Sequence, residues 1–129
     1  MGIQSCFTEY NAVLKNVNWS VSAINDRGEL VVSLWNQFFK KTAPKKLTYI
    51  DQVSRWSGNG NKEFISNLEK GYNSGMPVRV IIARTNNEAA IREGKDASKL
   101  KNRFHTRPDW KGKITLWNGD NFEIEFEPE

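Results

Sequence analysis

Hydrophobic and polar residues alternate along the first third of the chain in a way that predicts paired strands. Residues 19–24 alternate for most of their length, and residues 29–39 resume the pattern after the turn-forming sequence Asn25-Asp26-Arg27-Gly28. The second segment is rich in large apolar residues, which favours a central place in a sheet. We therefore predict a β-hairpin here, preceded by a short helix over residues 3–16, where apolar residues recur at helical spacing.

The middle of the chain changes from a strand pattern to a helical one. Residues 40–46 contain four lysines and are expected to form a basic loop, either a solvated hairpin tip or a phosphate-contacting loop. Residues 47–50 form a short strand. The helical spacing of Phe64, Ile65, Leu68 and Tyr72 predicts a helix that Asn59 or Asn61 caps and that Gly75 and Pro77 end. The apolar run Val78–Ala83 then predicts a strand buried on both faces.

The last third of the chain combines a charged segment with a clear hairpin. Asn86, Asn87 and Glu88 can cap a short turn through Ile91 that Gly94 ends, and a second short helix is predicted over residues 97–104, where strands are disfavoured. Residues 113–117 and 122–126 form a hairpin across Asn118-Gly119, with Phe122, Ile124 and Phe126 facing the core. The whole pattern predicts one α+β domain over residues 1–129. We expect a strongly bent, mostly antiparallel sheet or half-barrel with two main helices.

The composition of the chain indicates its cellular compartment and the kind of partner that it binds. The 129 residues include one cysteine, Cys6, which favours a reducing, cytoplasmic compartment, and no apolar run approaches the ~20 residues of a membrane span. The net charge is +4, but five acidic residues lie in the last ten positions, so residues 1–119 carry 19 basic against 10 acidic residues, a net charge of +9. A basic body predicts a polyanionic partner. The alternative is a basic protein tuned for solubility.

Most catalytic chemistry has no support in the sequence. One His and one Cys cannot build a zinc site, and Gly58-Asn59-Gly60 lacks the third glycine of a dinucleotide loop. His105 could act as a general base, but a single His beside an aromatic residue is more typical of a structural role. Asp51, Glu63 and Lys62 fit no nuclease spacing. The alternating C-terminal glutamates resemble a solvated edge strand. We therefore predict no catalytic residue, no metal and no cofactor.

The candidate site is the stretch Arg55-Trp56-Ser57-Gly58-Asn59-Gly60-Asn61, which runs into a helix N-terminus where unpaired N–H groups favour anions. An aromatic ring beside a cation can stack on a base while the cation meets phosphate. Arg107, Trp110 and Lys111 repeat this combination, although a loop tryptophan is commonly a lid over the core. The predicted nucleic-acid-binding residues are Arg55, Trp56, Ser57, Asn59, Asn61, Lys99, Lys101, Arg103, His105, Arg107, Trp110 and Lys111; further phosphate contacts are expected from Lys40, Lys41, Lys45 and Lys46.

A family resemblance rests on the same residues. Trp56-Ser57, Asn61, Leu68, Tyr72, Gly75 and the strand from Pro77 to Ile82 resemble the opening of YTH and EVE domains, which belong to the PUA-like superfamily; the run from Asp109 to Lys113 is similar to a later YTH segment. The resemblance implies that Trp56 and Trp110 form a cage for a modified base. Here, however, the unit follows a helix and three strands, so a permuted or independent barrel is implied. A comparable likeness to the DNA-recognition pseudo-barrels of some restriction enzymes, in which an early hairpin and basic loops meet DNA, implies a defence or restriction role.

The sequence thus predicts a nucleic-acid-binding module, with DNA favoured, that recognises a modified or flipped base in an aromatic-lined cleft. The first alternative is a small protein-interaction module or inhibitor, of phage or host-defence type, that docks on an acidic enzyme surface. The second is an enzyme acting on nucleic acid or nucleotides through Asp51, Glu63 or His105. No membrane partner is expected, and the oligomeric state stays open.

Overall fold

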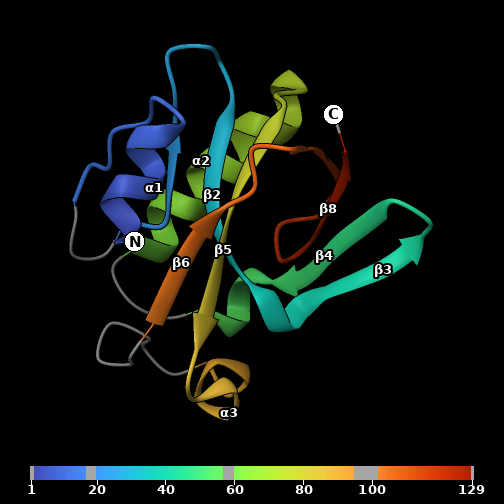
Figure 1. Ribbon diagram of the computed structural model, residues 1–129. Helices are drawn as coiled ribbons and strands as arrows, with labels where there is room; N and C mark the ends of the chain where they lie inside the picture. The colour runs from blue at the N-terminus through green and yellow to red at the C-terminus, as the bar shows by residue number, and fades with distance from the viewer. Residues whose placement is uncertain (1, 17–19, 57–59, 95–101, 129) are drawn as a thin grey trace.

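The computed structural model describes residues 2–16, 20–56, 60–94 and 102–128 and arranges them as an α+β fold (Figure 1). In chain order the elements are α1 (Ile3–Glu9), β1 (Ser22–Ile24), β2 (Leu30–Trp35), η1 (Asn36–Phe38), β3 (Phe39–Ala43), β4 (Lys46–Gln52), η2 (Val53–Arg55), α2 (Gly60–Ser74), β5 (Val78–Thr85), α3 (Glu88–Arg92), β6 (Asn102–Thr106), β7 (Trp110–Trp117) and β8 (Asn121–Pro128). None of the described helices is long and apolar enough to cross a membrane.

The eight strands form one open, mixed sheet. Its order is β1-β2-β5-β7-β8-β4-β3, and β6 pairs with β5 beside this path. Only β2 and β5 run parallel; every other pair is antiparallel. Strand β7 touches β5 through the single pair Val78 and Gly112, and the sheet turns there toward β8, β4 and β3. The prediction of an α+β fold with a bent, mostly antiparallel sheet and two main helices is confirmed.

The core has two parts, one on each side of β5. Helix α2 buries Phe64 and Leu68 against the larger part, which includes Val80 and Ile82 of β5. Helix α1 covers the smaller part, which includes Ile81. Because alternate residues of a strand point to opposite faces, both faces of β5 are buried, as predicted. The two helices therefore lie on opposite sides of the β2–β5 half of the sheet.

Helix α2 ends as predicted but packs differently. Gly75 takes the left-handed conformation at φ +64°, Met76 N donates to Gly71 O at 2.9 Å, and Pro77 follows. Tyr72, predicted to lie on the apolar side, is 41% exposed, and Gly71 is buried instead. A Cβ on Gly71 would lie 3.2 Å from Ile114 Cδ1. The helix approaches β7 so closely at this turn that a glycine fits there and an aromatic side chain does not.

Three predicted segments are wrong in their limits or type. The helix over residues 3–16 ends at Glu9, and Asn11 has a positive φ of 58°. Residues 29–39 are not one strand, because the helical turn η1 separates β2 from β3. The basic loop at residues 40–46 is mostly strand β3, with Pro44 and Lys45 in a tight turn and Lys45 at φ 59°.

The predicted helix over residues 97–104 is also wrong where it can be compared. Residues 102–104 belong to strand β6, which pairs with β5 from Ile81 to Thr85, while residues 97–101 lie outside the described part of the chain. Pairing with a buried neighbour overrides the low strand propensity of this charged segment. The short helix α3, with Asn87 Oδ1 accepting from Ala90 N at 3.1 Å, confirms the cap before Ile91.

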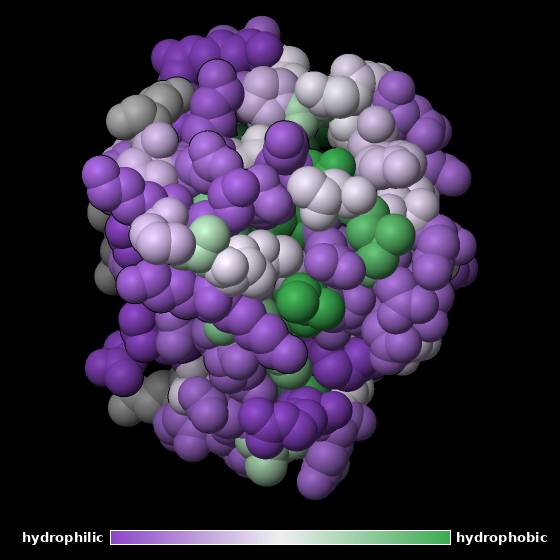
Figure 2. Space-filling model, turned by 90° about the vertical axis from the view of Figure 1, so that its right-hand side faces the viewer, coloured by the Kyte–Doolittle hydropathy of each residue, from purple (hydrophilic) through white to green (hydrophobic). Residues whose placement is uncertain are grey.

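The C-terminal hairpin is confirmed, with Phe122, Ile124 and Phe126 all buried. Strand β8 is not an edge strand, however, because it lies between β7 and β4. Lys113 and Lys111 lie opposite Glu125 and Glu127 in the register, and Lys46 Nζ lies 3.3 and 3.1 Å from carboxylate oxygens of the same two glutamates. The acidic C-terminal strand is thus flanked by lysines of its neighbours. Figure 2 shows a mainly hydrophilic surface on this side of the molecule.

Candidate functional site

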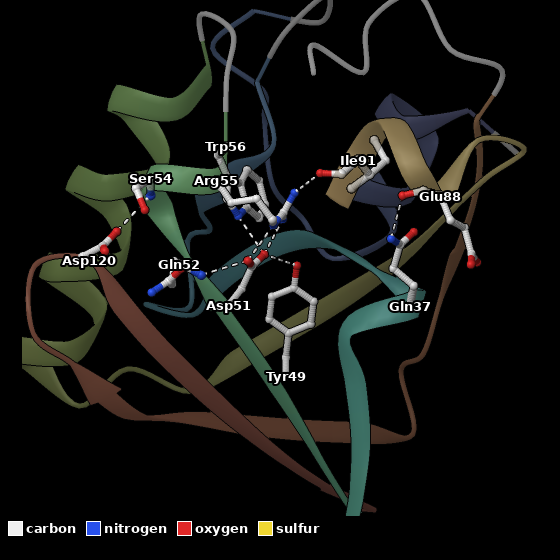
Figure 3. A network of polar contacts seen from close by, with 10 residues as sticks. All are labelled: Gln37, Tyr49, Asp51, Gln52, Ser54, Arg55, Trp56, Glu88, Ile91 and Asp120. Atoms are coloured by element: carbon white, nitrogen blue, oxygen red, sulfur yellow. Dashed lines mark hydrogen bonds and ion pairs between the residues drawn. The ribbon is translucent and has the colours of Figure 1, made fainter. Parts of the chain in front are cut away.

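The candidate stretch is organised by a carboxylate that precedes it, Asp51 at the end of β4 (Figure 3). Asp51 Oδ2 accepts hydrogen bonds from Tyr49 Oη and Trp56 Nε1, each at 2.8 Å, and from Arg55 Nη2. Asp51 Oδ1 accepts from Gln52 N at 2.8 Å and from Arg55 Nε at 2.7 Å. We call the side chains of Tyr49, Asp51, Arg55 and Trp56 the Asp51 network. A carboxylate with five donors is fixed in place and fully occupied.

Arg55 is held inside this network rather than presented to solvent. Its third nitrogen, Nη1, donates to Ile91 O at 2.7 Å, and its Cζ lies 4.3 Å from the centre of the Phe38 ring. The side chains of Arg55 and Asp51 are only 14% and 3% exposed. Burial alone would lower the pKa of Arg55, but the hydrogen bond and charge of Asp51 raise it above its usual value. Every guanidinium nitrogen therefore has a partner within the protein.

Trp56 packs as a lid over the core, which was the alternative interpretation of this residue. Its ring stacks on Phe64, with centroids 4.5 Å apart and planes inclined by 15°. On the Asp51 side its indole N–H is bound, and the Arg55 guanidinium carbon lies 5.5 Å from the ring centre. The ring is therefore fixed by the core below it and by the Asp51 network beside it.

The two tryptophans do not line one cleft. Trp110 lies opposite Pro128 at the open end of the β7–β8 hairpin. Trp56 lies at the turn end, where Asp120 O accepts from Val53 N at 2.8 Å and Asp120 Oδ1 accepts from Ser54 N at 3.0 Å. At about 3.3 Å per residue, β7 separates the two ends by roughly 23 Å. The predicted cage, which needs Trp56 and Trp110 together, is therefore not formed by these side chains.

Trp110 does keep its predicted basic neighbours, but they have acidic partners. Arg107 Cζ lies 5.2 Å from the Trp110 ring centre, and Arg107 binds Asp109 at 3.1 and 3.0 Å, which lowers the pKa of that carboxyl group. Lys111 lies opposite Glu127. Tyr10 Oη of α1's C-cap accepts from Arg107 N at 3.0 Å. Trp110 Nε1 is buried without a hydrogen-bond partner among the described residues. This end of the hairpin is charge-balanced.

A different pair of cations is brought together by the β5–β6 register. Arg84 lies directly opposite Arg103, and His105 lies opposite Ile82, so these three polar side chains share one face of the strand pair. Both arginines are exposed. The pKa of His105 is lowered, first by burial and then by the charges of Arg84 and Arg107. We call Arg84, Arg103 and His105 the arginine cluster. Sequence reasoning missed Arg84, because it ends an apolar strand and lies far from Arg103 in the chain.

The remaining predicted residues are dispersed. Asn61 lies inside the first turn of α2 and not at its cap, and its Oδ1 is buried without a described partner. Ser57, Asn59, Lys99 and Lys101 lie outside the described residues. Lys40, Lys41 and Lys45 are exposed on the β3–β4 hairpin. Within the described part of the chain, no group of three or more His, Cys, Asp or Glu side chains could hold a metal ion.

The Asp51 network also fixes helix α3, which lies in the chain between the two arginines. Besides the bond from Arg55 to Ile91 O, Gln37 Nε2 donates to Glu88 O at 3.0 Å. Gly94, which follows α3 in the chain, has φ +78°, and a Cβ on this residue would lie 2.5 Å from Arg55 O. The stretch that contains Arg55 thus acts as a support for α3.

Replacing Gly94 with alanine tests this contact. Gly28 offers a matched control, because its φ of +73° is similar but an added Cβ would have no atom within 4 Å. The strain of a left-handed residue costs about 1–2 kcal/mol at either position. We expect Gly28→Ala to show this loss alone in urea denaturation, and Gly94→Ala to lose more because the chain must also move away from Arg55. Equal losses of stability in the two variants would show that the close approach of Gly94 to Arg55 O does not contribute to the effect.

The chain has also been compared with known proteins. No protein-family model, no curated protein and no solved structure matches it. The resemblance to PUA-like domains therefore stays a prediction, and the function has to be inferred from the described residues themselves.

Proposed function

We propose that the protein binds the phosphate backbone of nucleic acid, with the arginine cluster as its centre. The observation that carries this proposal is the pair Arg84 and Arg103, which lie directly opposite each other on neighbouring strands. Like charges in this position destabilise a sheet. Neither guanidinium forms an ion pair with a carboxylate of the described residues. An anionic ligand would offset the repulsion.

The chemistry of the cluster favours phosphate. A guanidinium presents a planar set of donors that binds phosphate oxygens in pairs, and it stays charged at any physiological pH. His105, beside the two arginines, adds a ring N–H donor. The sequence continues the basic character before the strand with Lys99 and Lys101, whereas Arg107 after it is paired with Asp109. Several adjacent cations suit a polymer with repeated phosphates better than a single small anion.

The proposal is narrower than the sequence-based prediction. Trp56 is stacked on Phe64, and Trp110 lies at the other end of the hairpin. The proposed function therefore does not include recognition of a flipped or modified base between these two tryptophans. Backbone contacts position a protein on nucleic acid and carry no base information. DNA is favoured over RNA only as the sequence-based expectation, and the experiment includes both.

The test is the salt dependence of binding to fluorescein-labelled 20-nucleotide DNA and RNA, single- and double-stranded, measured by fluorescence anisotropy. Each phosphate contact contributes about 0.7–0.9 to the slope of log K against log salt concentration. We expect Arg84→Ala/Arg103→Ala to reduce the slope by about 1.4–1.8. As a control with the same loss of charge, Lys62→Ala/Lys70→Ala removes two exposed cations of α2 and should leave the slope unchanged. Binding that does not vary with salt, or an arginine variant with the parent slope, would refute the proposal.

A further inference from the structure

Strand β3 ends the sheet and leaves one backbone edge open. It is the last strand in the order β1-β2-β5-β7-β8-β4-β3 and, among the residues that the structure describes, it pairs only with β4. Figure 1 shows the β3–β4 hairpin projecting away from the helices on the right of the molecule. The outward N–H and C=O groups of an edge strand form a template on which another extended chain can pair.

The hairpin holds this edge in a preformed shape. Phe39 packs against Tyr49 and Phe126, with ring centroids 5.1 and 5.9 Å apart. Thr42 Oγ1 and Thr48 Oγ1 lie 3.0 Å apart and share a hydrogen bond across the two strands. Because β3 is already ordered, a partner that pairs with it does not have to bear the cost of ordering this side of the interface.

The charges on this edge are all positive. Lys40 and Lys41 are exposed neighbours, so they point to opposite faces of the strand, and Lys45 is exposed in the turn. The sequence has no acidic residue between Glu29 and Asp51. None of the three lysines forms an ion pair with a carboxylate of the described residues, whereas Lys46 binds Glu125 and Glu127.

The positive charge of this edge indicates which kind of chain can pair with β3. A second copy that paired β3 with β3 would bring lysines close to lysines across the new ladder, which is unfavourable. On the other side of the same hairpin, the fold itself shows the complementary pattern: β8 alternates glutamates with buried apolar residues and pairs with β4, where Lys46 contacts two of its carboxylates. A strand of this acidic, alternating type would place its glutamates on the face that Lys40 shares with Thr48 and Glu125, whereas Lys41 points to the opposite face.

We propose that the free edge of β3 binds an acidic, extended segment of a partner protein, which adds to the sheet as a further strand. Main-chain hydrogen bonds supply the pairing, and Lys40, with the nearby positive charges of Lys41 and Lys45, selects acidic side chains. The inference does not depend on the proposed nucleic-acid binding, because the arginine cluster lies on β5 and β6, whereas β3 is separated from β5 in the sheet by β7, β8 and β4.

The test uses a fluorescent nine-residue peptide of alternating glutamate and valine at 0.15 M salt, about physiological ionic strength, followed by anisotropy. A second peptide has the same sequence with N-methyl groups on four successive central amides, which block both of its edges but keep its charge. We expect the second peptide to bind at least about tenfold more weakly, a difference of about 1.4 kcal/mol. Equal binding of the two peptides would overturn strand addition, and so would no binding of the first peptide up to about 1 mM.

Matched protein variants locate the site. Lys40→Glu/Lys41→Glu should weaken binding of the unmodified peptide by at least about tenfold. Lys62→Glu/Lys70→Glu makes the same change of net charge on α2 and should leave binding within about twofold, because charges beyond a Debye length of ~8 Å are screened. Arg84→Ala/Arg103→Ala should also retain peptide binding, which separates this site from the arginine cluster. A single-stranded 20-nucleotide DNA whose binding depends on Lys40 and Lys41 and which displaces the peptide would assign the edge to nucleic acid instead.

Discussion

Replacing Asp51 with asparagine is expected to lower the free energy of unfolding by about 3–5 kcal/mol. The change keeps the size of the side chain but removes its charge and turns one acceptor oxygen into a donor nitrogen. Arg55, Trp56 and Tyr49 would then aim their donors at a group that can no longer accept all of them. The larger part of the loss comes from Arg55, whose buried charge would have no counter-ion.

Urea denaturation followed by circular dichroism measures this effect, with Asp26→Asn as the control. Asp26 is exposed in the Asn25–Gly28 turn, so its replacement should change the stability by no more than about 0.5 kcal/mol. A double variant gives an independent check. If the uncompensated guanidinium is the main cost, then Asp51→Asn/Arg55→Met should be more stable than Asp51→Asn alone, because methionine is an apolar residue that removes the buried charge. This explanation would be contradicted if the double variant lost as much stability as the single variants Asp51→Asn and Arg55→Met lose together.

A separate variant, Arg55→Lys, tests how the stretch around Arg55 relates to nucleic-acid binding. In the structure the Asp51 network holds α3, and α3 separates Arg84 from Arg103 along the chain. A direct phosphate contact by Arg55 would be a different role. Arg55→Lys keeps the positive charge but cannot donate to both Asp51 oxygens and Ile91 O in the same planar arrangement. A loss of stability without a change in the salt slope of nucleic-acid binding is what a supporting role requires.

The parts of the fold that could be predicted have strong local signals. The Asn118-Gly119 turn fixes the last hairpin, and Gly75 with Pro77 fixes the end of α2 and the start of β5. Strand β6 has no such signal, because its residues are polar or charged apart from Phe104, and they become a strand only through pairing with β5. The break after Trp35 was also missed, because the polar residues Asn36 and Gln37 are followed by Phe38 and Phe39, so the apolar pattern resumes into β3.

The candidate site was only partly predictable for the same reason. The sequence singled out Arg55 and Trp56 by their chemistry, but their shared partner is Asp51, which lies just before the stretch. A carboxylate four residues before an arginine was the available signal. The expected pairing of Trp56 with Trp110 fails because the length of β7 lies between them. The pair Arg84 and Arg103 exists only through the register of β5 and β6, which local patterns do not contain.

The second large effect is expected at Gly112, the only residue through which β7 pairs with β5. In the β7–β8 pair it lies directly opposite Phe126, and the phenylalanine ring covers the position where a side chain would be. A Cβ on Gly112 would lie 2.5 Å from both Cδ1 and Cε1 of that ring, which is 1% exposed. Gly112→Ala is therefore expected to cost about 1–3 kcal/mol of stability, because the ring must leave its place against Phe39.

A double-mutant cycle separates this clash from a general intolerance of the strand. Phe126→Leu removes the ring, so adding alanine at Gly112 should cost less in that background than in the parent, with a coupling of about 0.5–3 kcal/mol. Gly71→Ala is the matched control: its nearest neighbour is the flexible Cδ1 of Ile114 at 3.2 Å, and the helix gains up to about 1 kcal/mol from losing a glycine. If Gly112→Ala costs the same with leucine as with phenylalanine at position 126, the ring is not what requires a glycine where the sheet turns.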